Sequence, residues 1–356
     1  MRLLSWDLLT IVIFLAGVIF LFIKTKSRQI EFGFSVNFIT TGLALITDSF
    51  GSASAELFSF LRDEELDTNY VQLGTGSVLI VIGIWMSHYV KNKLTILNLL
   101  GVKERRIEEH RTDVGLNQFE FKEREIDLSY YAKKGMNQER YDDVTELIGI
   151  KMESFCAENK DVKKGYSGNA PIPLTMYAGY RYKGNPTTDF FEYHRFDQKY
   201  YKLQNANRWY RKKKRYPELS LQQPIDNMNL SEVEEVVLGV SVTMPITPEQ
   251  VQQFNVPFVH LSLPEPVHNA IQYEEQLYEY VQAIFKTILE LGYKPSIKRI
   301  HLVISSQSCL PFELGKQLTT ESYMKEVINY HYVNDSIPRY MWGISFNSQG
   351  TKFIQG

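Results

Sequence analysis

An apolar segment at 299–305 (RIHLVIS) ends in a run of four polar residues. Ser305 is the last residue of the segment, and Ser306, Gln307 and Ser308 follow it. The segment is typical of a buried strand in a parallel sheet, and a helix is predicted to begin near Pro311. In open α/β sheets, ligands bind at the carboxyl ends of strands, where the amides at the start of the next helix attract anions. The four residues are therefore candidates for binding an anionic ligand. The alternative interpretation is an ordinary strand-to-helix loop.

A second candidate is the basic and aromatic run at 208–216 (RWYRKKKRY), which carries six positive charges. Its cations could contact phosphates while an aromatic ring stacks on a base, or they could contact anionic lipid headgroups. An exposed loop is the simpler alternative. The residues assigned to phosphate or lipid contacts are Arg208, Trp209, Arg211, Lys212 and Lys213.

The sequence lacks the motifs of common catalytic and metal sites. It contains no GxxxxGK[ST] phosphate loop, and no GxGxxG follows a predicted strand. The seven histidines form neither HExxH nor a close cluster with cysteine or aspartate, so we expect no metal site and no cofactor. His194, His301 and His331 fall on predicted strands and are interpreted as core residues. We therefore expect a binding protein without catalytic residues.

Composition limits the class of protein further. The chain has 356 residues, of which 44% are hydrophobic and 22% charged, so it is long enough for two domains and is not globally disordered. The formal net charge of −2 provides no global attraction to nucleic acid, and no DNA partner is expected. The two cysteines, Cys156 and Cys309, exclude a disulfide framework.

The first 93 residues are predicted to form an all-helical transmembrane region. A span at about 4–23 and a second at 73–90 are each followed by basic residues, and each is about as long as the hydrocarbon layer is thick. A third candidate segment at 32–47 is diluted by polar residues. Apolar length favours two spans and the distribution of positive charge favours three, so both topologies stay open. The glycines at 74, 76 and 83 could allow close helix packing.

The remainder is predicted to alternate strands and helices, which favours an α/β sheet with parallel pairing. A charged connector is assigned to 94–136. Helices are expected at 138–158 and 270–291, with a capping box at 247–250. Strands are expected at 172–182, 190–194, 236–243, 258–263, 299–305, 327–332 and 340–346.

Two stretches of this region resemble each other. Residues 169–195 and 308–332 each contain proline, apolar residues, a glycine and a strand ending in Tyr-His. Gly179 then corresponds to Gly315, and Tyr193-His194 corresponds to Tyr330-His331. We interpret the pair as a diverged duplication of a Rossmann-like half, with chance similarity as the alternative.

These features resemble the SAVED sensor domains of bacterial cyclic-oligonucleotide antiphage systems (CBASS), in the form fused to N-terminal transmembrane helices. The resemblance lies in KRIHLVISSQSCLPFELGKQL at 298–318, EVINYHY at 326–332 and NAPIPLTMYAG at 169–179, within a matching region of roughly 140–356. It implies two fused CARF-like halves, 137–256 and 257–356. It also implies ligand contacts in the loops 167–173 and 305–308 and near 241–243, which adds Ser167, Asn169, Ser241 and Thr243 to the candidate residues.

The resemblance implies a membrane-anchored effector with a cytoplasmic C-terminal domain in the bacterial inner membrane. A cyclic tri- or tetranucleotide, made by a partner nucleotidyltransferase, would bind that domain. The protein would then oligomerise and disrupt the membrane in abortive infection. One alternative is a membrane-tethered nuclease that degrades the cyclic nucleotide, with His194, His331, Lys316 and the serines at 305–308 as its candidate residues. The other alternative is a non-catalytic membrane adaptor.

Overall fold

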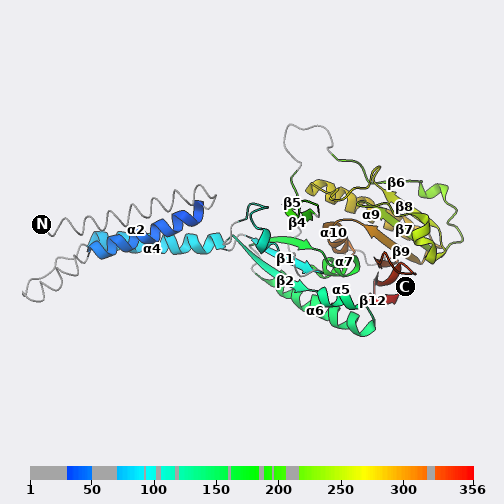
Figure 1. The fold of residues 1–356 in the computed structure, drawn as a ribbon, viewed down its shortest axis with the longest axis horizontal. Coiled ribbons are helices and arrows are strands. Elements are labelled where there is room, and N and C mark those ends of the chain that lie inside the picture. Colours follow the sequence, from blue (N-terminus) through cyan, green and yellow to red (C-terminus); the bar gives the residue numbers. More distant parts are fainter. Residues whose placement is uncertain are drawn as a thin grey trace, which may run out of the picture. The chain divides into compact units, whose positions relative to one another are not determined.

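The computed structural model describes residues 30–49, 70–91, 94–101, 106–116, 120–158, 162–183, 188–194, 196–205, 216–318 and 325–356. These residues divide into two compact units. The first is built on two helices, α2 (Ile30–Ser49) and α4 (Tyr70–Lys91), and the second contains nearly all of the strands (Figure 1).

Helices α2 and α4 pack closely through small residues. The Ser35 hydroxyl donates a hydrogen bond to the carbonyl oxygen of Gly83 at 2.6 Å, and a Cβ on Gly42 or Gly76 would overlap the carbonyl oxygen of the other glycine. Gly76 and Gly83 therefore have the close-packing role expected of them, whereas Gly74 has no neighbour within 4 Å of an added Cβ.

The predicted membrane segments fall differently on the described residues. The segment at 4–23 lies outside them, whereas 32–47 and 73–90 coincide with α2 and α4. In the part of the chain that the structure describes, no helix combines the length and the apolar composition needed to cross a membrane.

The second unit contains two sheets with the same central arrangement. The five-stranded sheet has the order β2-β1-β3-β4-β5, with β1, β3 and β4 parallel and β5 antiparallel. Its strands are β1 (Leu94–Leu100), β2 (Phe121–Asp127), β3 (Lys163–Gly168), β4 (Thr188–His194) and β5 (Lys199–Lys202).

The seven-stranded sheet has the order β12-β11-β10-β9-β7-β8-β6, in which β8, β7, β9 and β10 are parallel. Its strands are β6 (Ser220–Leu221), β7 (Glu235–Ser241), β8 (Phe258–Ser262), β9 (Arg299–Ser305), β10 (Glu326–Tyr332), β11 (Tyr340–Asn347) and β12 (Gly350–Gln355).

Helices connect the strands in the same sequence in both halves. In the first half, α6 (Gln138–Ala157) precedes β3 and α7 (Ile172–Arg181) links β3 to β4; in the second, α9 (Glu274–Tyr293) precedes β9 and α10 (Cys309–Gln317) links β9 to β10. This parallel order supports the predicted duplication. The remaining helices among the described residues are α5 (Ser129–Lys134), α8 (Pro248–Val251) and the 3-10 turns η1 (Glu108–His110), η2 (Ile225–Asn227) and η3 (Gln252–Phe254).

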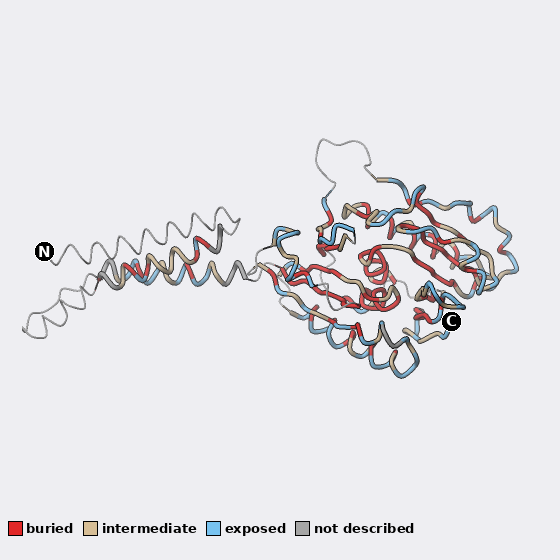
Figure 2. Tube along the Cα trace, in the orientation of Figure 1, coloured by how far each residue is buried: buried red, intermediate tan, exposed pale blue. Residues whose placement is uncertain are grey.

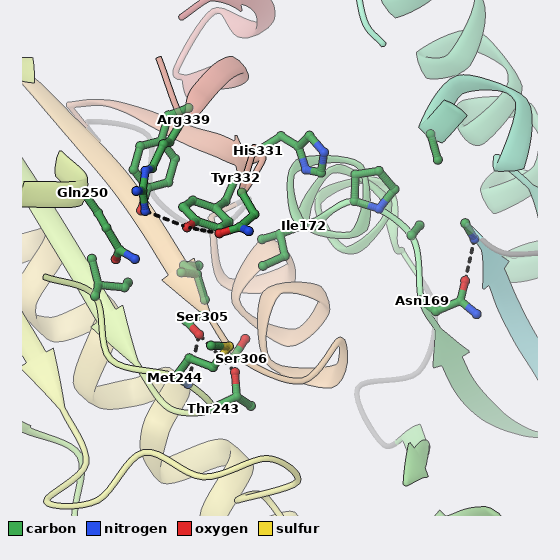
Figure 3. Close-up of a pocket in the computed structure, with 18 of the residues that line it drawn as sticks. Asn169, Ile172, Thr243, Met244, Gln250, Ser305, Ser306, His331, Tyr332 and Arg339 are labelled. Carbon is green, nitrogen blue, oxygen red and sulfur yellow. Dashed lines mark hydrogen bonds between the residues drawn. The ribbon is translucent and has the colours of Figure 1, made fainter. Parts of the chain in front are cut away.

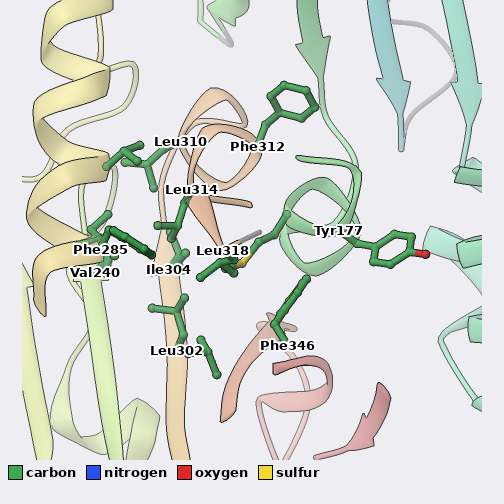
Figure 4. Packing of buried hydrophobic residues seen from close by; sticks show 14 of the residues in the cluster. Tyr177, Val240, Phe285, Leu302, Ile304, Leu310, Phe312, Leu314, Leu318 and Phe346 are labelled. Carbon is green, nitrogen blue, oxygen red and sulfur yellow. The ribbon is translucent and has the colours of Figure 1, made fainter. Parts of the chain in front are cut away.

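Apolar burial explains the positions of these helices. Helix α9 buries Leu277, Val281, Ile284, Ile288 and Leu291, a spacing of three to four residues that puts them on one face. Helices α7 and α10 are buried along most of their length (Figure 2). In Figure 4, Leu310 and Leu314 of α10 point toward α9, whereas Phe312 points toward the first sheet. There the Phe312 ring stacks on Tyr166 of β3, with ring centroids 3.9 Å apart.

Several sequence expectations are corrected here. The predicted strand at 172–182 is helix α7. The prediction was wrong because this helix is buried on nearly all sides, so its sequence lacks the one-sided apolar pattern of a surface helix. The segment 94–136, predicted as a connector, contributes β1 and β2 to the first sheet; β1 is buried at every position. Strand β7, placed before the expected boundary at 256, pairs with β9 in the middle of the second sheet.

Candidate ligand-binding site

A cavity of about 730 Å³ lies where strands β3, β7, β9 and β10 end and helix α7 begins. Both halves contribute to its wall, so it lies at the crevice that the duplicated topology creates. The described lining residues are Gly101, Ala132, Asn169, Ala170, Pro171, Ile172, Thr243, Met244, Pro245, Ile246, Gln250, Ile304, Ser305, Ser306, His331, Tyr332, Asn334, Arg339 and Tyr340.

Ser305 fixes the loop after β7 to the end of β9. Its carbonyl oxygen accepts from the amides of Val242 and Thr243, both at 2.9 Å. Its hydroxyl accepts from the amide of Met244 at 3.1 Å and lies 3.0 Å from the hydroxyl of Thr243 (Figure 3). The wall of the cavity is therefore held in place before any ligand arrives.

Asn169 has the same role on the side of the first half. The backbone amide of Asn169 donates to the carbonyl oxygen of Leu99 at 2.9 Å. The side-chain oxygen of Asn169 accepts from the backbone amide of Gly101 at 2.6 Å. A side chain at Gly101 would overlap the backbone of Asn169, so this close approach requires glycine.

Arg339 carries the one permanent charge among the described lining residues, none of which is a carboxylate. The guanidinium donates to the Tyr332 hydroxyl at 3.1 Å, and that hydroxyl lies 3.2 Å from the side-chain oxygen of Asn334 (Figure 3). Burial lowers the pKa of His331 to about 4, so its imidazole is neutral at pH 7. The described lining of the cavity therefore carries a net positive charge, which suits an anion.

Gln253 supports this side of the cavity from behind. Its side-chain amide donates to the carbonyl oxygen of Tyr340 and accepts from the amide of Tyr340, both at 3.0 Å. This paired contact ties η3 to the start of β11, directly after Arg339.

The structure brings four of the eight predicted ligand residues into the lining: Asn169, Thr243, Ser305 and Ser306. Ser241 is instead buried, with its hydroxyl 2.7 Å from Nε2 of His260 and accepting from the amide of Ile246 at 2.9 Å. Ser167 is buried in β3. The basic residues at 208–213 lie outside the described residues.

Gln307 and Ser308 serve the packing of the two halves. The Gln307 side chain accepts from the amide of Ile271 at 2.7 Å and donates to its carbonyl oxygen at 2.9 Å and to the Tyr201 hydroxyl at 2.7 Å. The Ser308 hydroxyl donates to Glu192 at 3.1 Å. Neither residue lines the cavity.

The candidate nuclease residues are only partly brought together. His331 lines the cavity with Ser305 and Ser306. Lys316, however, pairs with Glu313 at 2.6 Å, and His194 pairs with Asp197 at 3.1 Å; neither lines the cavity. No cluster of histidine, cysteine or acidic residues among the described residues could hold a metal ion.

Sequence reasoning missed Arg339, Tyr332 and Gln250 as lining residues. Arg339 follows β10 by seven residues and lies in the loop before β11, where nothing in its spacing indicates a ligand. The duplication gives one usable signal: His331 corresponds to His194, the last residue of β4, and lies one residue before the carboxyl end of β10.

The described residues thus form a mixed α/β domain of two halves, with a crevice at the ends of their strands. The family model for SAVED, the SMODS-associated and fused to various effectors sensor domain, matches residues 151–346, more than half of the chain. The chain therefore belongs to the SAVED family. Comparison with curated proteins finds no match.

The chain is also similar to solved structures of Cap4 receptors. One is the Acinetobacter baumannii Cap4 SAVED/CARF-domain containing receptor with the cyclic trinucleotide 2′3′3′-cAAA, at 11% identity and a TM-score of 0.47, over 90% of this chain and 64% of that one. Another is the Moraxella osloensis Cap4 receptor, at 14% identity and a TM-score of 0.42, over 91% of this chain and 74% of that one. The chain thus spans less than two thirds of the length of the Acinetobacter receptor.

Proposed function

We propose that this protein senses a cyclic tri- or tetranucleotide, which binds in the cavity between the two halves. Membership of a sensor-domain family supports the proposal. The observation that carries it is the charge of the lining: Arg339 is its permanent cation, and no described carboxylate opposes a ligand phosphate. The partly buried ring of Tyr332 provides a surface on which a base can stack.

The first test measures binding of the purified full chain, in detergent, to a panel of cyclic di-, tri- and tetranucleotides that includes 3′3′3′-cAAA. Calorimetry and size-exclusion chromatography with light scattering would follow affinity and mass together. We expect one tri- or tetranucleotide to bind and to raise the mass. If no member of the panel binds a chain that melts cooperatively, the ligand assignment is wrong.

We further propose that the N-terminal region anchors the protein in the bacterial inner membrane, with the sensor domain in the cytoplasm. Ligand binding would drive oligomerisation, and the clustered helices would disrupt the membrane in CBASS-type abortive infection. Two features support this. The sequence contains two long uncharged apolar runs, and α4 exposes Val78, Val81 and Trp85.

A deletion of residues 1–93 tests this output. Cells that coexpress the full chain with a cognate nucleotidyltransferase should depolarise, and cells with the deletion should not, although the deletion variant should still bind the nucleotide. Depolarisation or death caused by the deletion variant would remove the membrane mechanism and leave the sensor assignment standing.

A second candidate function is cleavage of the bound cyclic nucleotide, which the presence of His331, Ser305 and Ser306 in the lining of one cavity favours. A neutral imidazole could accept the proton of a ribose 2′-hydroxyl as that oxygen attacks the neighbouring phosphorus. The bond from phosphorus to the 5′-oxygen of the next nucleotide would then break, the imidazolium would return the proton to that oxygen, and a linear product with a 2′,3′-cyclic phosphate would remain. Linear product that forms with the wild type and not with His331→Ala would support it. Intact ligand after long incubation would exclude it. A non-catalytic adaptor, by contrast, predicts no thermal shift with any nucleotide.

A further inference from the structure

The carboxylate of Glu192 is buried in β4, outside the cavity, and 5% of the residue is exposed. One of its oxygens, Oε1, accepts from the backbone amide of Cys309 at 2.7 Å and from the hydroxyl of Ser308 at 3.1 Å. Glu192 belongs to the first sheet, whereas Ser308 and Cys309 begin α10 in the second half. The carboxylate therefore holds the first turn of α10 from across the boundary between the halves.

The ionisable groups that lie near Glu192 among the described residues provide no opposing charge. They are Tyr166 of β3, Tyr201 of β5 and Cys309 of α10, and burial raises the pKa of each. Burial also raises the pKa of Glu192 to about 7. An unpaired buried carboxylate costs folding stability, so its presence is better explained by what it positions than by what it stabilises.

The loop that Glu192 holds is part of the cavity wall. Ser305 and Ser306 line the cavity three and two residues before Ser308, respectively. Ser305 in turn fixes Thr243 and Met244, which follow the end of the neighbouring strand β7. Displacement of the start of α10 would therefore displace both strand ends that form this wall.

The other half lacks an equivalent carboxylate. The match of Tyr193-His194 with Tyr330-His331 pairs Glu192 with Asn329, whose side-chain amide donates to the carbonyl oxygen of Leu302 at 3.2 Å. The corresponding helix, α7, begins at Pro171 and Ile172, and both of these line the cavity. The start of one helix is thus held by a buried carboxyl group, and the start of the other faces the ligand space.

We infer that Glu192 is a positioning residue: its carboxyl group accepts the hydrogen bonds of Ser308 and Cys309 at the start of α10 and fixes the loop 305–308 in its ligand-binding conformation. The inference rests on the proposed function for the identity of the ligand. The positioning itself can be tested without a ligand, so that failure of one can be told from failure of the other.

The experiment compares Glu192→Ala and Glu192→Gln in the full chain with the control Glu313→Gln. Glu313 is a buried carboxylate in α10, the helix whose start Glu192 contacts, but Glu313 forms an ion pair with Lys316. Amide hydrogen exchange over 306–312 reports the loop, and calorimetry with 3′3′3′-cAAA reports binding. Glutamine keeps an acceptor oxygen of the same reach, whereas alanine removes it.

We expect Glu192→Ala to speed exchange over 306–312 and to weaken cAAA binding by about tenfold or more, since it removes two hydrogen bonds to an acceptor that can be charged. Glu192→Gln should restore both to within about threefold, and Glu313→Gln should leave exchange at 306–309 unchanged. If Glu192→Ala does not fold, Glu192→Asp, which keeps the charge but shortens the reach, should show the same loss.

Exchange over 306–312 that is the same in the wild type, Glu192→Ala and Glu192→Asp would overturn the inference, whatever the nucleotide does. Faster exchange with no nucleotide binding in any variant, the wild type included, would instead reject cAAA as ligand and support the positioning role.

Discussion

Gly179 and Gly315 occupy equivalent places in the two repeats and form the two sides of one helix crossing. An added Cβ on Gly179 would overlap the carbonyl oxygen of Phe312 in α10, and one on Gly315 would overlap the carbonyl oxygen of Met176 in α7. The contact is thus reciprocal, as a pseudo-twofold relation between the halves requires. It brings the backbones of α7 and α10 together at the centre of the domain.

Alanine at either glycine should therefore destabilise the domain. We expect Gly179→Ala and Gly315→Ala each to lower the free energy of unfolding by about 2–3 kcal/mol, because the helices must separate to admit a methyl group. Urea unfolding measures the change. Gly292→Ala in α9 is the control: an added Cβ there meets no atom closer than 3.5 Å, so a slight gain in stability is expected. Equal behaviour of all three variants would contradict the crossing.

Arg339 should contribute to nucleotide affinity through its charge. Arg339→Ala is expected to weaken binding by about tenfold or more, with Arg339→Lys in between, because lysine keeps the charge but loses the fork of donors. Calorimetry at two salt concentrations measures this. Tyr332→Phe removes the hydroxyl that accepts from Arg339 and separates loss of charge from loss of orientation. Lys286→Ala on the exposed face of α9 should bind as the wild type does.

Neighbouring residues of the loop 305–308 should separate into ligand contacts and structural contacts. Gln307→Ala leaves the backbone groups of Ile271 without their partner, so we expect a loss of about 1–3 kcal/mol in the free energy of unfolding. Ser306→Ala should leave stability nearly unchanged and weaken nucleotide binding. Thermal melts and calorimetry on both variants check the pair, and a stable Gln307→Ala chain that fails to bind would reverse the assignment.

Glu192 should make stability depend on pH. Its pKa is raised from 4.5 to about 7 in the folded chain, so between these values the folded state binds more protons than the unfolded state. The free energy of unfolding should therefore fall as pH rises from about 5 to 8, by an amount on the order of 3 kcal/mol at most. Glu192→Gln removes this dependence and should gain on the wild type as pH rises. Urea unfolding at pH 5 and pH 8 measures the difference in the free energy of unfolding between Glu192→Gln and the wild type. A difference that is the same at both pH values contradicts the assignment. Gly292→Ala, which changes no titratable group, should shift stability equally at both.

The sequence was sufficient for elements with a clear period. Helix α9 and strands β9 and β10 lie where their apolar spacing predicts them, and the capping box of Thr247 and Gln250 forms both of its hydrogen bonds. The matched glycines were also visible in sequence. Their shared contact was not, because it depends on how the two halves pack against each other.

Other parts of the fold could not be read in this way. Helix α7 is buried on nearly all sides, so it lacks the polar face that identifies a helix. Strand β2 carries five charged residues among its seven, so its sequence was interpreted as part of a solvated connector. Near the cavity, Ser241 and Gln307 are polar residue types that often bind ligands. Their side chains instead form hydrogen bonds with His260 and Ile271, which are distant in sequence.

The placement of α7 and α10 has a consequence for how the domain folds. Helix α10 of the second half contacts β3 and β4 of the first, and α7 contacts β10 and β11 of the second. A fragment limited to one half would expose apolar side chains that only the other half covers. The two repeats must therefore acquire their cores together, and separated halves could regain structure only through fragment complementation.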